Sequence, residues 1–234
     1  MLYIIGLGLN KKGITMEALE AIKKCKRVYL ENYTVDFPYT ENELKEIIDK
    51  KIIPADREFV ESLEIIDEAK KLNVALLVYG APLTATTHIS LIQEAKECRV
   101  KCKLIYSASI LDAVAETGLQ IYKFGKITSI PNFEADSYLE TVKENTSIKA
   151  HSLLLIDIGL ESNKVLDKLQ KDADKHKIKL KKLLLCSCLG TKKKKIYYNT
   201  LENLKEKDIR KPYCIVIPGK LHFIEKEILE KFFT

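Results

Sequence analysis

Small and polar residues follow four strand-like apolar runs of this 234-residue chain, at Gly6–Asn10, Gly80–His88, Ser107–Ile110 and Pro218–His222. Glycine lets the backbone approach a ligand closely, and hydroxyl, amine and imidazole groups bind polar ligands. In α/β proteins, ligands sit at the carboxyl ends of strands or between domains. The four segments together therefore predict a small-molecule site formed by loops at strand ends.

The first segment does not fit a dinucleotide site. Gly6 and Gly8 come directly after the apolar run, but the third glycine of the dinucleotide fingerprint would stand at position 11, where the chain has Lys11. A Rossmann-type NAD site is therefore disfavoured. Two interpretations stay open for these glycines, a tight strand-to-loop turn and close approach to another ligand.

The second segment also has two interpretations. Thr86 or Thr87 could simply cap the helix that follows, because threonine side chains accept hydrogen bonds from backbone amides at helix starts. His88 taken alone is more often a satisfied structural histidine than a catalytic one.

The elements that must position these loops alternate between strand and helix, which predicts an α/β fold with mostly parallel strands and right-handed crossovers. The chain length favours two domains, which we place at residues 1–108 and 109–234. Thr15 and Asp56 are expected to cap helices, the second a long one. A polar loop is expected between a strand at Leu183–Cys188 and one at Tyr213–Pro218.

Composition excludes several classes of protein. The chain has 46% hydrophobic and 31% charged residues, with a net charge of +6, so long-range disorder is excluded and the bias toward acidic partners is mild. No apolar stretch is long enough to span a bilayer, and the start lacks the features of a secretory signal. The spacing of the six cysteines matches no common zinc pattern. We therefore expect a soluble cytoplasmic protein with no metal site and ordinary buried or half-buried thiols.

The chain resembles the diphthine synthases, a group within the tetrapyrrole methylase superfamily. The match is colinear from Met1 to about Asp157, resumes at Pro218, and is weak in between. The motifs that carry it are Leu2–Leu9, Ala81–His88 (Ala-Pro-Leu-Thr-Ala-Thr-Thr-His), Gly118–Gly125, Ser137–Tyr138, Lys143–Asn145, His151–Asp157 and Pro218–His222.

This resemblance implies a two-domain α/β methyltransferase, usually a homodimer, that binds S-adenosylmethionine in a cleft between its domains and releases S-adenosylhomocysteine. It further implies that the substrate is translation elongation factor 2, in which one histidine carries an aminocarboxypropyl group whose amine is methylated repeatedly. By position, the cofactor contacts of the family fall on Leu9, Ala81, Thr84, Ser109, Ile110, Ile156, Ser187 and His222.

The expected chemistry is an in-line displacement by an unprotonated amine, for which positioning suffices and no metal is needed. The residues point to no obligatory general base, so the catalytic residues stay unassigned. Two departures from the family pattern stand out. Ala81 occupies the place of an aspartate, and the stretch Cys186–Gly190 lacks an arginine that is common there.

These departures keep alternatives open. The chain could be a catalytically silent relative that binds elongation factor 2 or the cofactor, or a methylase of the same fold that acts on ribosomal RNA or a tetrapyrrole. The lysine-rich segments Lys171–Lys182 and Lys192–Lys195 slightly favour RNA. Such segments are more often a solvated helix face and a surface loop, so we expect neither direct nucleic-acid binding nor membrane binding.

Overall fold

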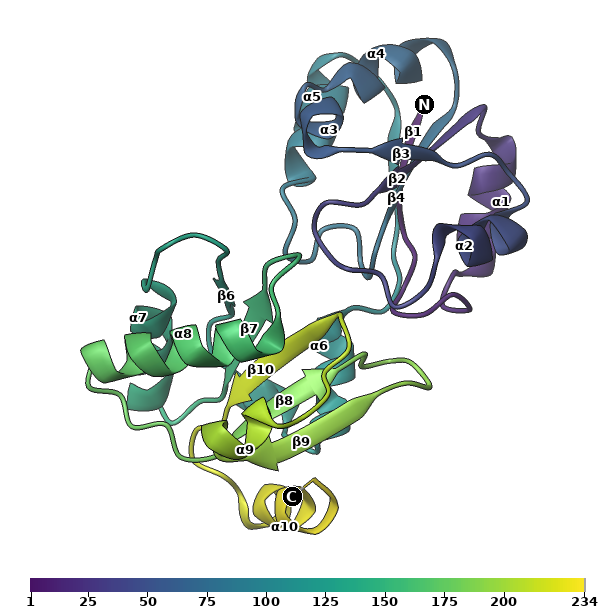
Figure 1. Ribbon diagram of the computed structural model, residues 1–234. Helices are drawn as coiled ribbons and strands as arrows, with labels where there is room; N and C mark the ends of the chain where they lie inside the picture. Colours follow the sequence, from purple (N-terminus) through teal and green to yellow (C-terminus); the bar gives the residue numbers. More distant parts are fainter. Residues whose placement is uncertain (234) are drawn as a thin grey trace. The chain divides into compact units, whose positions relative to one another are not determined.

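The computed structural model describes residues 1–233 and divides into two compact units, unit 1 (Met1–Leu111) and unit 2 (Asp112–Thr234). Figure 1 shows a sheet and helices in each unit, which confirms the expected α/β class. Within the described residues, no helix has both the length and the apolar character required to span a membrane.

Unit 1 is built on a five-stranded sheet in the order β3-β2-β4-β1-β5, and every pairing in it is parallel, as expected. Its strands are β1 (Leu2–Gly6), β2 (Arg27–Glu31), β3 (Ile53–Ala55), β4 (Val74–Val78) and β5 (Cys102–Ile105). Its helices are α1 (Met16–Lys24), α2 (Glu41–Ile48), α3 (Arg57–Glu61), α4 (Glu64–Lys71) and α5 (Ile89–Glu97). The short helix α6 (Ile110–Ala113) crosses from unit 1 into unit 2.

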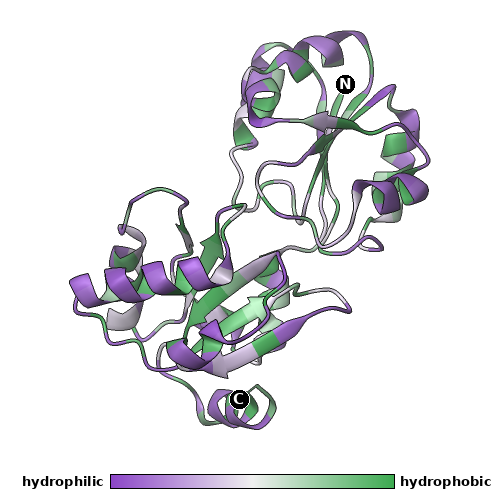
Figure 2. Cartoon of the chain, viewed as in Figure 1, coloured by the Kyte–Doolittle hydropathy of each residue, from purple (hydrophilic) through white to green (hydrophobic). Residues whose placement is uncertain are grey.

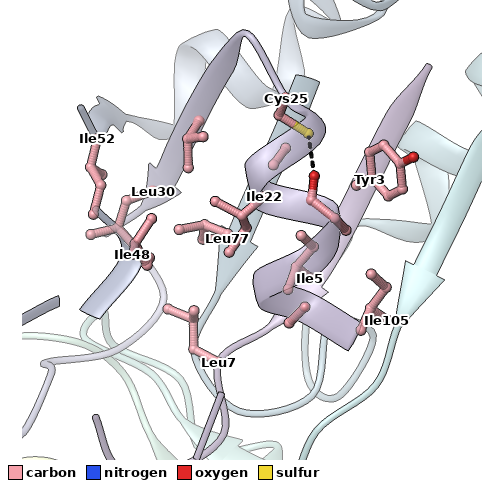
Figure 3. Close-up of a cluster of buried hydrophobic side chains, with 14 of the residues drawn as sticks. Tyr3, Ile5, Leu7, Ile22, Cys25, Leu30, Ile48, Ile52, Leu77 and Ile105 are labelled. Atoms are coloured by element: carbon pink, nitrogen blue, oxygen red, sulfur yellow. Dashed lines mark hydrogen bonds between the residues drawn. The ribbon is translucent and has the colours of Figure 1, made fainter. Parts of the chain in front are cut away.

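Two apolar clusters cover the two faces of this sheet, because successive side chains of a strand point to opposite sides. In β1, Tyr3 and Ile5 belong to the cluster that includes Ile22 of α1 and Ile48 of α2 (Figure 3). Leu2 and Ile4 belong to the opposite cluster, which α3, α4 and α5 complete. All five residues of β1 and of β4 are buried, as expected of central parallel strands.

The helix starts follow local capping chemistry. The Thr15 hydroxyl accepts a hydrogen bond from Ala18 N at 3.1 Å, and Asp56 accepts one from Phe59 N at 2.8 Å, so both predicted caps are confirmed. The predicted long helix after Asp56 is wrong, because the chain forms two short helices, α3 and α4. Leu63 between them has a φ of 65°, in the left-handed region, which interrupts a right-handed helix.

Unit 2 has a second five-stranded sheet in the order β6-β7-β10-β8-β9. Its strands are β6 (Thr128–Ile130), β7 (Ser152–Ile156), β8 (Leu183–Ser187), β9 (Lys195–Asn199) and β10 (Tyr213–Ile217). The helices are α7 (Tyr138–Ser147), α8 (Ser162–Lys175), α9 (Leu201–Lys205) and α10 (Phe223–Phe232), with 3₁₀ turns η1 (Val114–Thr117) and η2 (Ile121–Lys123).

The pairing within unit 2 differs from the expectation of mostly parallel strands. Among the described residues β6 and β7 pair in parallel, whereas β7–β10, β10–β8 and β8–β9 are antiparallel. A buried apolar run predicts a strand but carries no information about the direction of its neighbours. In Figure 2, β7 and β10 are mostly green, for hydrophobic residues, whereas α8 is mostly purple, for hydrophilic ones.

The segment expected to be a polar loop contains β9 and α9. Strand β9 lies at the edge of the sheet, begins at the last residue of the lysine block and pairs with β8 from Lys195↔Ser187 to Asn199↔Leu183. Edge strands often carry lysines, which discourage pairing with other chains. The lysines of this segment therefore led to the prediction of a loop where the chain forms strand β9.

Candidate active site

Three loops of unit 1 meet at the carboxyl edge of its sheet. The register pairs Gly6 of β1 with Val78 of β4, and Ile5 with Ile105 of β5, so the chain leaves these three strands at one level. The loops that follow are residues 7–14, 79–88 and 106–109. The structure therefore brings together three of the four segments selected from the sequence.

Close backbone contact joins the first two loops. Gly8 N donates to Gly80 O and Gly80 N donates to Gly8 O, both at 3.1 Å. Gly8 has a φ of +69°, and a Cβ there would lie 2.8 Å from the Ser107 hydroxyl and 3.0 Å from Gly13 O. A side chain at Gly8 would collide with the Ser107 loop and with Gly13 of its own loop, which agrees with the tight-turn interpretation of this glycine.

Leu9 and Lys11 have different roles in the first loop. Leu9 is buried, and its carbonyl accepts a hydrogen bond from the Tyr79 hydroxyl at 3.0 Å. Lys11 forms an ion pair of 2.7 Å with Glu43 at the start of α2. The hydrogen bond from Lys11, together with that from the Thr40 backbone, lowers the pKa of Glu43 to about 2. The residue that replaces the third glycine is thus a structural cation.

The second loop places Ala81 and Thr84 at its first turn. Thr84 N donates to Ala81 O at 3.1 Å, and both residues are half-buried. The expectation that Thr86 or Thr87 caps the next helix is wrong. The residue at the cap of α5 is His88, whose side chain makes no capping bond, and the Thr86 hydroxyl donates to Pro82 O at 3.0 Å.

The third loop ends at Ser109 and Ile110. Ser109 is 5% exposed, and its hydroxyl accepts a hydrogen bond from Leu111 N at 3.1 Å, at the start of α6. Ile110 is half-buried. Unit 1 therefore gathers five of the eight predicted contact residues: Leu9, Ala81, Thr84, Ser109 and Ile110.

Ile156 and Ser187 lie at a common end of the sheet in unit 2. Ile156 ends β7 and Ser187 ends β8, and both flank the start of β10, where Tyr213 pairs with Ser187 and Cys214 with Leu155. The Ser187 hydroxyl is buried and donates to Arg210 O at 2.6 Å. The Ser187 hydroxyl is therefore already engaged within the chain.

His222 lies at the opposite end of the same sheet. Strand β10 runs antiparallel to β7, and its last residue, Ile217, pairs with Ser152 at the start of β7. The length of β7 from Ser152 to Ile156 is roughly 13 Å at about 3.3 Å per residue. Within unit 2, the Pro218–His222 loop therefore lies at the end of the sheet away from Ile156 and Ser187, because β10 runs antiparallel to β7 and β8.

A buried ion network lies at the end of the unit 2 sheet where His222 is found. The Glu225 carboxylate is 0% exposed and accepts hydrogen bonds from Gln120 N at 2.9 Å, His222 N at 2.7 Å, His151 Nε2 at 3.2 Å and Lys123 Nζ. Burial opposes ionisation, but the four donors outweigh it and lower the pKa of Glu225 to about 2.

His151 extends this network to the loop after β10. Its Nδ1 accepts a hydrogen bond from Gly219 N at 2.9 Å, and burial lowers the pKa of His151. A groove of about 500 Å³ lies beside the network and is lined in part by Lys123, Lys149 and His222. No pattern in the sequence predicts the hydrogen bond between His151 and Glu225, which are 74 positions apart.

Among residues 1–233, no group of three or more histidine, cysteine, aspartate or glutamate side chains is arranged to hold a metal ion. All six cysteines are free thiols, four buried and two half-buried.

Comparison with known proteins identifies the family. The model of the family "Tetrapyrrole (Corrin/Porphyrin) Methylases" matches residues 1–205. The chain is 35% identical over 266 residues to the diphthine methyl ester synthase of Schizosaccharomyces pombe, an alignment that covers 99% of this chain and 94% of the relative. It is 36% identical over 251 residues to the diphthine synthase of Methanocaldococcus jannaschii, with 98% of each chain covered.

A solved structure agrees. A crystal structure of diphthine synthase superposes with a TM-score of 0.92 at 32% identity, covering 100% of this chain and 96% of that one. The chain belongs to the tetrapyrrole methylase family, in its diphthine synthase group. It is therefore a methyltransferase, and the resemblance read from its motifs is confirmed.

Proposed function

We propose that this chain uses S-adenosylmethionine to methylate, repeatedly, the amine of the aminocarboxypropyl-histidine of translation elongation factor 2. The observation that carries the proposal is the convergence of three strand-end loops in unit 1. It is joined by the names of the relatives, which match this chain over nearly their full length and are named for diphthine synthesis. We further propose that it acts in the cytoplasm, as expected from its composition, and that it is a homodimer, as the resemblance implies.

The donor groups of unit 1 fit this cofactor. The converging loops offer apolar surface from Ala81 and Ile110, a half-buried hydroxyl at Thr84, and backbone groups around Leu9. Lys11, the cation of the first loop, is engaged by Glu43. A site with apolar surface and hydroxyl groups suits a nucleoside joined to an amino acid, which carries no phosphate.

When bound, S-adenosylmethionine supplies an electrophilic methyl group on a sulfonium. The chain has to hold that ligand, orient it and keep water away. We assign the holding to the Leu9 loop and the Ala81–Thr84 turn, with Ser109 fixing the start of α6. We assign an apolar contact to Ile110 in unit 1. Ile156 and Ser187 of unit 2 are kept as proposed contacts because the resemblance places contacts there. Orientation alone can lower the barrier by roughly 7 kcal/mol or more in well-placed reactions.

His222 remains the least supported of the predicted contacts. It lies beside the groove near Glu225, at the end of the sheet that does not carry Ile156 and Ser187. We keep it as a proposed contact only because the resemblance places one there, and direct ligand mapping decides it.

The alternatives receive less support. The lysine-rich segments that slightly favoured RNA are partly neutralised, since Lys175 pairs with Asp136 at 2.6 Å and Lys194 pairs with Glu116. The relatives described above are named for diphthine synthesis, which does not favour a methylase of RNA or a tetrapyrrole.

Transfer of labelled methyl groups tests the proposal. The chain is incubated with labelled S-adenosylmethionine and elongation factor 2 bearing the aminocarboxypropyl group, the unmodified factor, or ribosomal RNA. Label is expected only in the modified factor. Label in RNA, or binding of the factor without label, would support one of the alternatives instead.

A pair of variants in one loop gives the control. Thr84→Val removes the half-buried hydroxyl of the proposed site, whereas Thr87→Val removes an exposed hydroxyl three positions further along. The Thr84 variant is expected to transfer label more slowly at low cofactor concentration, and the Thr87 variant to behave like wild type.

A further inference from the structure

His88 is a buried polar side chain whose place in the fold is not explained by the helix it precedes. It is 1% exposed and stands at the cap position of α5 without making a capping bond. Its ring instead reaches two other segments. Nδ1 lies 3.2 Å from Pro82 O, and Nε2 lies 3.5 Å from the Tyr33 hydroxyl.

The partners fix the direction of both contacts. A carbonyl oxygen only accepts hydrogen bonds, so Nδ1 of His88 carries the hydrogen that faces Pro82. Nε2 is then the acceptor, and the Tyr33 hydroxyl donates to it. The ring thus bridges the loop after β4 and the segment after β2.

The loop after β4, at one end of this bridge, contains a strained backbone that neighbouring groups must hold in place. Two of its residues have left-handed backbone conformations, Gly80 with a φ of 71° and Ala85 with a φ of 56°. For alanine this conformation is strained, and such residues persist where the surroundings over-determine them. The carbonyl of Pro82 accepts from both His88 and the Thr86 hydroxyl, so two side chains restrain one peptide at the centre of the loop.

The other end of the bridge, the segment around Tyr33, is held in place by hydrogen bonds to a buried carboxylate. Glu31 is 0% exposed and accepts hydrogen bonds from Tyr33 N at 2.9 Å, Thr34 N at 2.8 Å and the Thr34 hydroxyl at 2.8 Å. Burial, with a smaller contribution from Glu31, raises the pKa of Tyr33 to about 12, so its hydroxyl stays a donor. The guanidinium of Arg57 lies over the Tyr33 ring, 5.3 Å from its centroid.

We propose that His88 is a positioning residue, which ties the Pro82 carbonyl to the Tyr33 segment and so holds Ala81 and Thr84 in the conformation that binds the cofactor. The inference rests on the proposed function, because it takes the Ala81–Thr84 turn to be part of the cofactor site. It assigns His88 no contact with the cofactor and no proton transfer.

Calorimetric titration with S-adenosylhomocysteine tests the proposal on three variants. His88→Ala removes both contacts and is expected to weaken binding by about tenfold, in the range of a lost buried hydrogen bond. His88→Asn keeps an N–H close to the position of Nδ1 and is expected to stay within about threefold of wild type. Tyr33→Phe removes only the distal hydroxyl and is expected to fall between them.

Steady-state kinetics separates positioning from general destabilisation. His88→Ala is expected to raise the KM for S-adenosylmethionine while kcat at saturating cofactor stays near the wild-type value. His176→Ala is the matched control, since His176 belongs to unit 2, where it contacts Asp136 at 3.0 Å. A lower melting temperature of His88→Ala with unchanged affinity and KM would overturn the proposal. Equal losses in His88→Ala and His88→Asn would also overturn it.

A measurement without ligand keeps the inference separate from the proposed function. Hydrogen exchange of the free protein reports on the Thr84 amide, which donates to Ala81 O. Exchange in residues 81–87 is expected to accelerate in His88→Ala and much less in His88→Asn. If wild type fails to bind S-adenosylhomocysteine, the proposed function fails. Unchanged exchange in His88→Ala would refute the positioning role by itself.

Discussion

Glu225→Gln removes the charge at the centre of the buried network in unit 2. The carboxylate accepts four hydrogen bonds, and Gln120, His222, His151 and Lys123 supply them. An amide has one oxygen, so its NH₂ group would face some of these donors. The ordinary pKa of this carboxyl is 4.5 and the folded-state value is about 2. At about 1.4 kcal/mol per unit, the network favours the ionised form by roughly 3 kcal/mol.

The sign of the pH dependence follows from the lowered pKa. Below pH 4.5, Glu225 becomes protonated in the unfolded chain but stays ionised in the folded chain. The free energy of unfolding therefore falls as the pH drops from about 4.5 toward 2. By about pH 3.5, roughly 1.4 kcal/mol of this contribution should be lost. The lowered pKa of His151 acts in the same direction and begins at higher pH, near its ordinary 6.5.

Urea unfolding at pH 7 and pH 3.5 measures both effects. We expect Glu225→Gln to be less stable than wild type by about 3 kcal/mol at pH 7, and the difference to shrink at pH 3.5. The control is Glu227→Gln, an exposed residue of the same helix, for which we expect no comparable loss. A loss below about 1 kcal/mol for Glu225→Gln, with an unchanged pH dependence, would refute the reasoning.

Three further variants address the proposed cofactor site. Gly8→Ala should weaken S-adenosylhomocysteine binding at least tenfold and destabilise the chain by about 1–3 kcal/mol, because its Cβ would collide with Ser107 and Gly13; wild-type affinity in calorimetry would contradict this. Ala81→Asp should tighten S-adenosylmethionine binding severalfold, more than S-adenosylhomocysteine binding, since a carboxylate there favours the sulfonium charge by about 1 kcal/mol. Titration of both ligands checks it; unchanged affinity would show that the loop binds through its backbone, and weaker binding would show that the site is built around the smaller residue. His222→Ala should cost less than about 1 kcal/mol in thermal unfolding, because its side chain is exposed and the bond that it accepts from Ile224 N is long, at 3.4 Å; a larger loss would show an unrecognised structural role.

Sequence reasoning worked best where local chemistry decides structure. The fully buried runs of β1 and β4, and the caps at Thr15 and Asp56, follow from side-chain types within a few residues of each other. The three loops of unit 1 could also be predicted, because parallel strands bring their carboxyl ends to one edge.

Non-local pairing accounts for the misses. The direction of β10 places His222 at the far end of its sheet, and no residue near His222 signals that direction. Strand β9 was not predicted, because its segment is rich in lysines, which an edge strand tolerates. The Glu225 network joins Gln120, His151 and Glu225 across up to 105 positions, and the bond of His88 to Tyr33 spans 55. These partners become neighbours only after the sheets form.

Hydrogen exchange of the wild-type chain, with and without S-adenosylhomocysteine, tests the central claim most directly. The account predicts slower exchange with ligand in the three loops at residues 7–14, 79–88 and 106–109. Protection confined to unit 2, for example around residues 218–222, or no protection in the three loops, would contradict the assignment of the cofactor site to the strand ends of unit 1.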